Sequence, residues 1–114
     1  MSTLRNSVKL IGNVGQVPEI KTLENGRKVA NFSIATNETY TNKDGERVTQ
    51  TYWHNLVAWG KTAEIIENYV DKGREVAVEG KLTNRSYETK DGQKRYITEV
   101  LVNEILLLGN KTNS

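Results

Sequence analysis

The sequence predicts an all-β fold with one short helix, in which five strands close into a small barrel. Three dipeptides, Asn25-Gly26, Asp44-Gly45 and Asp91-Gly92, carry the residues that tight hairpin turns favour, because both types tolerate positive φ. The segments beside them are rich in Val, Ile, Thr and Tyr, which are common in strands. One stretch alone has apolar residues at helical spacing. These observations favour an antiparallel β architecture.

The expected elements follow one another in a recognisable order. A helix is predicted over Lys61–Val70, where apolar residues recur at helical spacing and Gly73 follows shortly after. This helix separates the third strand from the fourth, which is the arrangement of an OB-fold barrel. Long hairpins are expected to project from the barrel at Tyr40–Val48 and Tyr87–Arg95. The five predicted strands are Leu4–Gly12, Lys28–Asn37, Thr51–Trp59, Glu75–Tyr87 and Arg95–Leu108.

Size and composition limit the class of protein. A chain of 114 residues has core for one domain, which we expect over residues 1–109, with residues 110–114 as a short disordered end. The absence of Cys and the single histidine, His54, argue against a zinc site and against cysteine catalysis. All three Asp residues fall in turns or at the helix end, so no carboxylate cluster for metal-assisted catalysis is predicted. We expect neither enzyme activity nor a cofactor.

The charge and hydropathy patterns bear on partners and location. No apolar run approaches the roughly 20 residues that cross a bilayer, and the N-terminus lacks a signal-peptide pattern. Together with the absence of Cys, this favours a cytoplasmic protein without membrane contact. The formal charge of +2 permits nucleic-acid binding only through a local basic surface.

Aromatic residues are the first candidates for a binding surface. Strand alternation places Trp53, Asn55 and Trp59 on one face, with the two indoles about 20 Å apart along the strand. Spacing alone divides evenly between core packing and a pair of stacking platforms. Tyr40 and Tyr87 favour stacking, because each lies among polar residues of a predicted hairpin. Exposed aromatics of this kind stack on the bases of single-stranded nucleic acids.

Basic residues accompany these aromatics. Each one alone is more often a solvated surface charge than a phosphate contact, but the set as a whole favours a groove that follows a strand. Lys81 and Arg85 share strand parity with Tyr87, while Glu79 and Glu88 dilute the charge of that region. The candidate phosphate contacts are Lys43, Lys61, Lys72, Arg74, Lys81 and Arg85.

Three glycines lie at or inside the ends of predicted elements. Gly12, Gly60 and Gly80 fit barrel corners and bulges, where glycine is commonly needed. The alternative is that they allow a nucleic-acid backbone to approach closely. We favour the first interpretation.

At this point the chain resembles the bacterial single-stranded-DNA-binding protein (SSB) family. The resemblance covers nearly the whole chain, from about Asn6 to Gly109, and the ordered series is more specific than any one segment. The segments that carry it are Val8–Glu19, Val29–Thr36, Trp53–Lys61, Tyr69–Gly73, Val78–Leu82 and Arg95–Val100.

The resemblance implies roles for particular residues. The family's base-stacking aromatics fall on Tyr40, Trp53, Trp59 and Tyr87, and a family histidine at the subunit interface falls on His54. It also implies a homotetramer that binds single-stranded DNA without catalysis, in replication, recombination and repair. The family's acidic tail has no counterpart after Glu104, so we expect a short form, native or truncated, in which recruitment of proteins through a tail is doubtful.

Three alternatives remain open at the level of sequence. A primosome-type OB-fold accessory protein would be a dimer that relies on lysines more than on tryptophans. An OB-fold adaptor would use the aromatics as protein-binding hot spots. A small OB-fold nuclease would cleave the strand with a divalent metal. Stacking and phosphate contacts serve DNA and RNA alike.

Overall fold

The computed structural model describes residues 4–109, and the expected end at 110–114 lies outside this range. Its elements are the strands β1 (Val8–Val14), β2 (Glu19–Thr22), β3 (Lys28–Thr41) and β4 (Arg47–Trp59), the helix α1 (Gly60–Tyr69), and the strands β5 (Glu75–Glu88) and β6 (Lys94–Leu107). Apart from the short strand β2, which was not predicted, the order is three strands, one helix and two strands. This order confirms the predicted all-β class. In the described range, no helix is long and apolar enough to cross a membrane.

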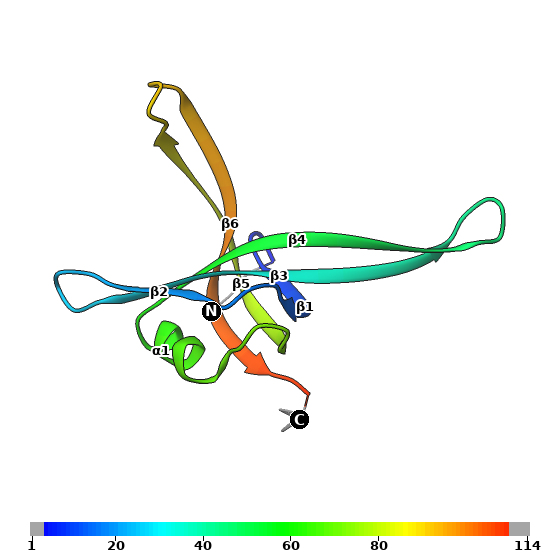
Figure 1. Ribbon diagram of the computed structural model, residues 1–114, viewed down its shortest axis with the longest axis horizontal. Helices are drawn as coiled ribbons and strands as arrows, with labels where there is room; N and C mark the ends of the chain where they lie inside the picture. Colours follow the sequence, from blue (N-terminus) through cyan, green and yellow to red (C-terminus); the bar gives the residue numbers. More distant parts are fainter. Residues whose placement is uncertain (1–3, 110–114) are drawn as a thin grey trace.

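Five of the strands form a closed barrel. The strand order is β1-β5-β6-β4-β3, and β1 also pairs with β3, through Asn13 opposite Ala35 and Val14 opposite Ile34. All pairs are antiparallel except β4–β6, a short parallel contact that joins Leu56 to Val100. Strand β2 is added outside the ring, on the edge of β3. This arrangement is the predicted OB-fold barrel (Figure 1).

The core lies inside this ring. Ile34, Leu56 and Val76 are fully buried there, each on the inward face of its strand. Helix α1 contributes Ala63 and Ile66 to the same cluster and packs against β3, β4 and β6. Tyr69, on the same helical repeat, remains exposed. The hydrophobic effect therefore holds the helix to the barrel through one narrow face.

An ion pair also joins α1 to the sheet. The Lys28 ammonium donates to Glu67 Oε1 at 2.7 Å. This hydrogen bond, supported by the charges of Glu67 and Glu64, raises the pKa of Lys28 above its ordinary value. The raised pKa means that the contribution to stability is complete at neutral pH and is lost only as pH rises above the ordinary range of a lysine.

Two hairpins project far beyond the barrel, as predicted (Figure 1). We call residues 37–51 the β3–β4 arm and residues 84–98 the β5–β6 arm. Both continue the regular strand pairing of the barrel. Strands β3 and β4 are therefore longer than the sequence predicted, whereas β5 and β6 agree with their predicted bounds to within one residue at each end. The same side-chain bond stands at the base of each arm, with Thr51 donating to Asn37 Oδ1 and Thr98 donating to Asn84 Oδ1, both at 2.8 Å.

The tip of the β3–β4 arm is held by one side chain. Asn42 Oδ1 accepts the backbone N–H groups of Asp44 at 3.0 Å and Glu46 at 2.9 Å. Gly45, at φ 81°, supplies the left-handed position that the turn requires. The predicted Asp44-Gly45 turn is confirmed.

The first strand was predicted too early, over Leu4–Gly12. The structure begins it at Val8 and ends it at Val14. Leu4 is exposed, and Asn6 is bound to the main chain of Leu82 through its side-chain amide, at 2.9 and 3.2 Å. This bond fastens the segment beside β5 without extending β1.

Candidate nucleic-acid interface

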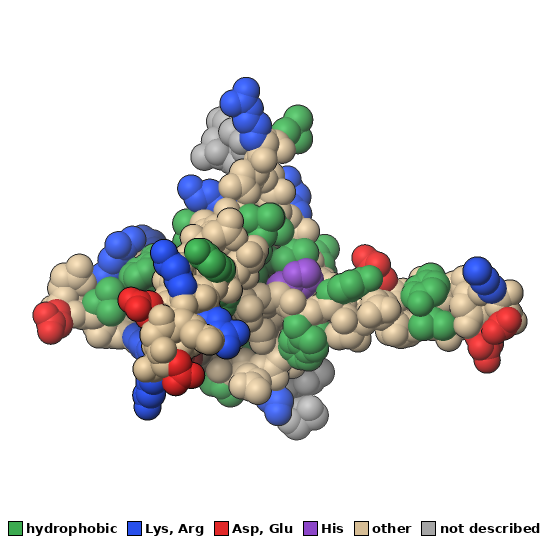
Figure 2. Space-filling model, turned by 90° about the horizontal axis from the view of Figure 1, so that it is seen from above, with side chains coloured by type: hydrophobic (Ala, Val, Ile, Leu, Met, Phe, Trp, Pro, Cys, Tyr) green, Lys and Arg blue, Asp and Glu red, His purple; other side chains and the backbone are tan. Residues whose placement is uncertain are grey.

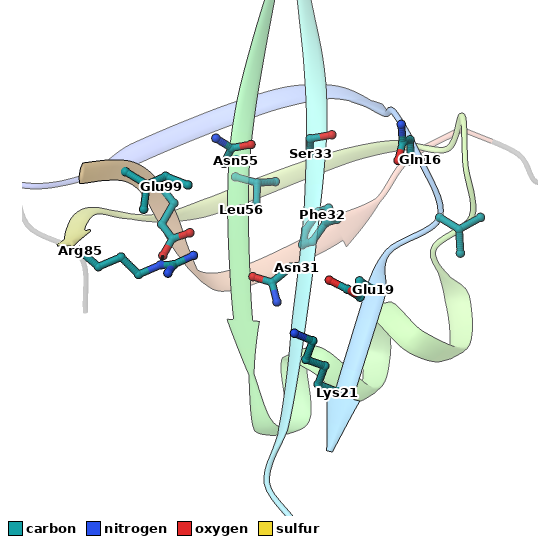
Figure 3. Close-up of a pocket in the computed structure, with 12 residues that line it drawn as sticks. Gln16, Glu19, Lys21, Asn31, Phe32, Ser33, Asn55, Leu56, Arg85 and Glu99 are labelled. Carbon is teal, nitrogen blue, oxygen red and sulfur yellow. Dashed lines mark hydrogen bonds and ion pairs between the residues drawn. The ribbon is translucent and has the colours of Figure 1, made fainter. Parts of the chain in front are cut away.

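A groove crosses the outer face of β3 and β4, where residues alternate with those of the core. On this face Ser33 lies opposite Asn55 and Asn31 lies opposite Val57. The groove has a volume of about 630 Å³ and is open to solvent. Figure 3 shows side chains from β2, β3, β4 and the β5–β6 arm around it. Its polar and charged lining residues are Gln16, Glu19, Lys21, Asn31, Ser33, Asn55, Arg85 and Glu99.

Trp53 stands beside this groove as an exposed ring. It shares the outward face of β4 with Asn55, as predicted, and 62% of its surface is exposed. The indole lies against the backbone of Gly15, because a Cβ built there would fall on the ring, 2.9 Å from Cη2. The Gly15 N–H also donates to the Ser33 carbonyl at 3.0 Å, so this support is fixed to β3. Gly15 is a site residue that the sequence analysis missed.

Replacing Gly15 by alanine is expected to weaken ligand stacking on Trp53 without unfolding the barrel. The added methyl would overlap the ring of Trp53 and must displace it. Because the ring is exposed, it can rotate away without disturbing the core. We expect a loss of roughly 1 kcal/mol in oligonucleotide affinity, about one stacked base at the low end. Fluorescence titration measures it, and urea unfolding is the control. Unchanged affinity together with a changed emission spectrum would contradict the role of Gly15.

Trp59 lies on the same face as Trp53, at the C-terminal end of β4, but its surroundings differ. It is partly buried, and the guanidinium carbon of Arg27 lies 4.5 Å from the centre of its ring. Arg27 follows the Asn25-Gly26 turn between β2 and β3. The two tryptophans are therefore not equivalent platforms, although the family resemblance implies base stacking for both.

The β5–β6 arm brings Tyr87 and basic residues to the groove side. Lys81, Arg85 and Tyr87 alternate on one face, as predicted, opposite Leu101, Ile97 and Arg95. Leu101 is in turn paired with Val57 of β4, so this face continues into the outer face of the barrel. Tyr87 is about half exposed.

Arg85 is held by a buried carboxylate. Its Nε donates to Glu99 Oε1 at 2.7 Å, and Glu99 is only 7% exposed. Figure 3 shows the pair at one side of the groove. A carboxylate buried to this degree needs such a partner. Arg85 is thus positioned at the groove, and Glu99 offsets part of its charge.

Replacing Glu99 by glutamine is expected to raise the affinity for an anionic strand about threefold. Gln keeps an acceptor for Arg85 but removes a charge worth on the order of 0.6 kcal/mol at roughly 7 Å in water. Titration with an oligonucleotide measures the change, with Glu64→Gln on the exposed side of α1 as the control for net charge. A lower affinity would show that the charge of Glu99 is needed to position Arg85.

Tyr40 lies elsewhere. It pairs with Val48, and this parity places it on the face of the β3–β4 strand pair that also carries Tyr52 and His54. Trp53 is on the opposite face of the same strand pair. The four aromatics named by the sequence therefore do not form one row, and a strand that contacts both Tyr40 and Trp53 must pass around the arm.

The remaining predicted cations are dispersed. Lys43 is at the tip of the β3–β4 arm, and Lys61 and Lys72 are exposed at the two ends of α1. Arg74 donates to the carbonyls of Leu108 at 3.0 Å and Gly109 at 3.3 Å, which ties β5 to the end of β6. Lys and Arg side chains are likewise spread across the face seen in Figure 2. The structure brings only Lys81 and Arg85 of this set to the face of Tyr87.

His54 lies away from the tryptophans, as predicted. Its Nε2 is 3.0 Å from Thr36 Oγ1, and it lines a shallow hollow with Tyr52 and Ile11. Figure 2 shows the histidine beside hydrophobic side chains at the base of the β3–β4 arm.

Comparison with known proteins identifies the family. The sequence profile of the single-strand binding protein family matches residues 5–108. The chain belongs to this family. Two similar members are the single-stranded DNA-binding proteins of Neisseria meningitidis strains Z2491 and MC58, each 41% identical over 109 residues. The alignment covers 96% of this chain and 63% of each relative, so the chain spans less than two thirds of their length.

A solved structure of the family has the same fold. The chain superposes on the Plasmodium falciparum SSB in complex with ssDNA with a TM-score of 0.85 and 36% identity. The match covers 96% of this chain and 98% of that one. The described chain therefore shares its overall fold with that SSB.

Proposed function

We propose that this protein binds single-stranded DNA with little sequence preference, by stacking bases on exposed aromatics and holding phosphates with basic side chains. The observation that carries the proposal is the exposed indole of Trp53 beside a groove lined by amides and a hydroxyl. Membership of the single-strand binding protein family and the likeness to an SSB solved with ssDNA support it. The basic residues that line the groove and the aromatic ring beside it are the groups that single-strand binders combine.

The proposed mechanism is equilibrium capture without catalysis. Bases stacked inside a duplex do not offer their faces to Trp53, so unpaired DNA is bound more tightly than duplex. Binding then shifts the melting equilibrium by mass action, which protects single strands and removes hairpins. Such a protein would serve replication, recombination and repair, in the cytoplasm with the nucleoid.

Fluorescence titration with poly-dT at two salt concentrations tests this function. Stacking on Trp53 predicts quenching with a stoichiometric end point, and phosphate contacts predict weaker binding at higher salt. No quenching and no mobility shift would reject DNA binding and favour a protein-binding adaptor. Cleavage of the oligonucleotide on addition of a divalent metal would instead show an enzyme.

We further propose that the protein assembles as a homotetramer and that the His54 face is a subunit contact. Ile11, Ala77 and Leu106 lie side by side on adjacent strands and form an outward apolar row. Ile11 and Leu106 are both more than half exposed, and Ile11 also borders the hollow of His54. Exposed apolar surface of this kind is typical of interfaces.

Replacing Ile11 by aspartate should break the assembly. A charge in an apolar contact costs several kcal/mol when it is buried without a partner. Light scattering is expected to show four chains for the wild type and fewer for the variant. Leu23→Asp, at the β2–β3 turn, is the control and should leave the mass unchanged. An unchanged mass for Ile11→Asp would place the subunit contact on another face.

A further inference from the structure

Arg27 covers the ring of Trp59 from a turn with a fixed backbone. The backbone carbonyl of Arg27 accepts a hydrogen bond from the N–H of Leu23 at 2.8 Å, and the backbone N–H of Arg27 donates to Asn25 Oδ1 at 2.9 Å. Its guanidinium carbon lies 4.5 Å from the centre of the indole. A guanidinium so close to an aromatic ring is attracted by the ring's negative face.

This contact occupies one face of Trp59 but leaves the edge of the guanidinium available. Stacking uses the plane of the group, whereas its five N–H donors lie at the edge. Within residues 4–109, the ion pairs of Arg and Lys join Lys9 to Glu79, Lys28 to Glu67 and Arg85 to Glu99, and Arg27 takes part in none of them. Its donors therefore remain open to an external anion.

A second cation lies beside it. Lys21 of β2 is paired with Val29 of β3, which is paired with Trp59 of β4, so the three residues form a row on the outer face. Lys21 also lines the groove, next to Glu19 (Figure 3). The surface beyond Lys21, at the edge of the groove, thus carries two cations around a ring that is already partly covered.

We propose that Arg27 binds a phosphate of the DNA strand and that Trp59 is its platform, so that the surface next to the groove at Lys21 holds the sugar-phosphate backbone rather than a base. A planar guanidinium held on a ring presents paired N–H groups that match two phosphate oxygens. This inference rests on the proposed binding of single-stranded DNA. It divides the interface into a base-stacking part at Trp53 and a phosphate-binding part at Arg27.

Comparing Arg27→Ala with Lys28→Ala tests the proposal. The two neighbours lose the same charge, but Lys28 is bound to Glu67 of α1 and serves as the control. Affinity for oligo-dT is measured at four salt concentrations. Loss of one phosphate contact should lower the salt slope by about 0.7 for a single strand, which is about a fivefold loss of affinity at 0.1 M relative to 1 M salt. The loss should be equal for oligo-dC, and Lys28→Ala should keep the wild-type slope.

Trp59 fluorescence provides a second measurement. In a Trp53→Phe protein, Trp59 is the one remaining tryptophan. If Arg27 covers it, Arg27→Ala in this protein should change its emission before DNA is added, and DNA should quench it weakly while Arg27 is present. An unchanged salt slope for Arg27→Ala, a gain in affinity, or strong quenching of Trp59 with Arg27 in place would overturn the proposal. A wild type that binds no oligonucleotide would overturn the proposed function itself, a result separate from any of these.

Discussion

Replacing Trp53 and Tyr87 together by alanine should weaken the binding of poly-dT by several kcal/mol. Each stacked base is worth about 1–3 kcal/mol by alanine substitution. Both rings are exposed, so their removal costs the fold little. Competition with a labelled oligonucleotide measures the loss, since the double variant retains only the Trp59 signal.

Tyr96→Ala is the matched control for Tyr87. Tyr96 is 74% exposed on the same β5–β6 arm, but it pairs with Ser86 and lies on the other face. Its removal should change the affinity by less than a few tenths of a kcal/mol. Equal losses from Tyr87→Ala and Tyr96→Ala would mean that stacking is not confined to the groove side of the arm.

Replacing Gly80 by alanine should destabilise the barrel by about 3 kcal/mol, at the upper end of the usual cost of overpacking. Gly80 is buried at an irregularity in the β5–β6 pairing, where it lies opposite Val102 of β6. A Cβ would fall onto the Leu101 carbonyl oxygen, 2.9 Å from its carbon and 3.1 Å from Val102 Cα. All of these are backbone atoms, which have little room to move. Urea unfolding measures the change.

Lys81→Ala, at the next residue, is the control for Gly80→Ala. Its side chain is exposed, so stability should change by at most about 0.5 kcal/mol. A stability of Gly80→Ala within that range would show that the two strands can separate locally. The position of Gly80 supports the barrel-corner interpretation made from the sequence. Gly12 is similar, since a Cβ there would meet the Ala35 carbonyl.

The sequence predicted those parts of the fold that depend on neighbouring residues. The hairpin dipeptides and the helical spacing before Gly73 are local signals, and the barrel order followed from them. Strand β2 was missed because it is four residues long and mostly exposed, so it has no alternating pattern. It forms a strand because it pairs with β3, a contact between segments that its own sequence does not reveal.

The same distinction between local signals and distant contacts explains which site residues were predicted. Strand parity alone predicted the common face of Trp53 and Asn55 and that of Lys81, Arg85 and Tyr87. Gly15, Arg27 and Glu99 were missed because their roles depend on segments that are distant in sequence. Gly15 supports a ring 38 positions away, and Arg27 covers one 32 positions away. The one local signal was Gly26, which predicted a turn directly before Arg27. The assignment of individual residues to DNA contact stays a prediction.

The turn held by Asn42 has a consequence for the arm it closes. Both faces of this arm are open to solvent, so no inward or outward pattern of side chains selects one alignment of its strands. The Asn42 hydrogen bonds and the turn at Gly45 therefore set the register of the two strands in the arm. A slip by one residue within the arm would carry Tyr40 to the face on which Trp53 lies at the base of the arm. A substitution at the tip could thus exchange the surfaces offered to a ligand while every aromatic residue stays in place.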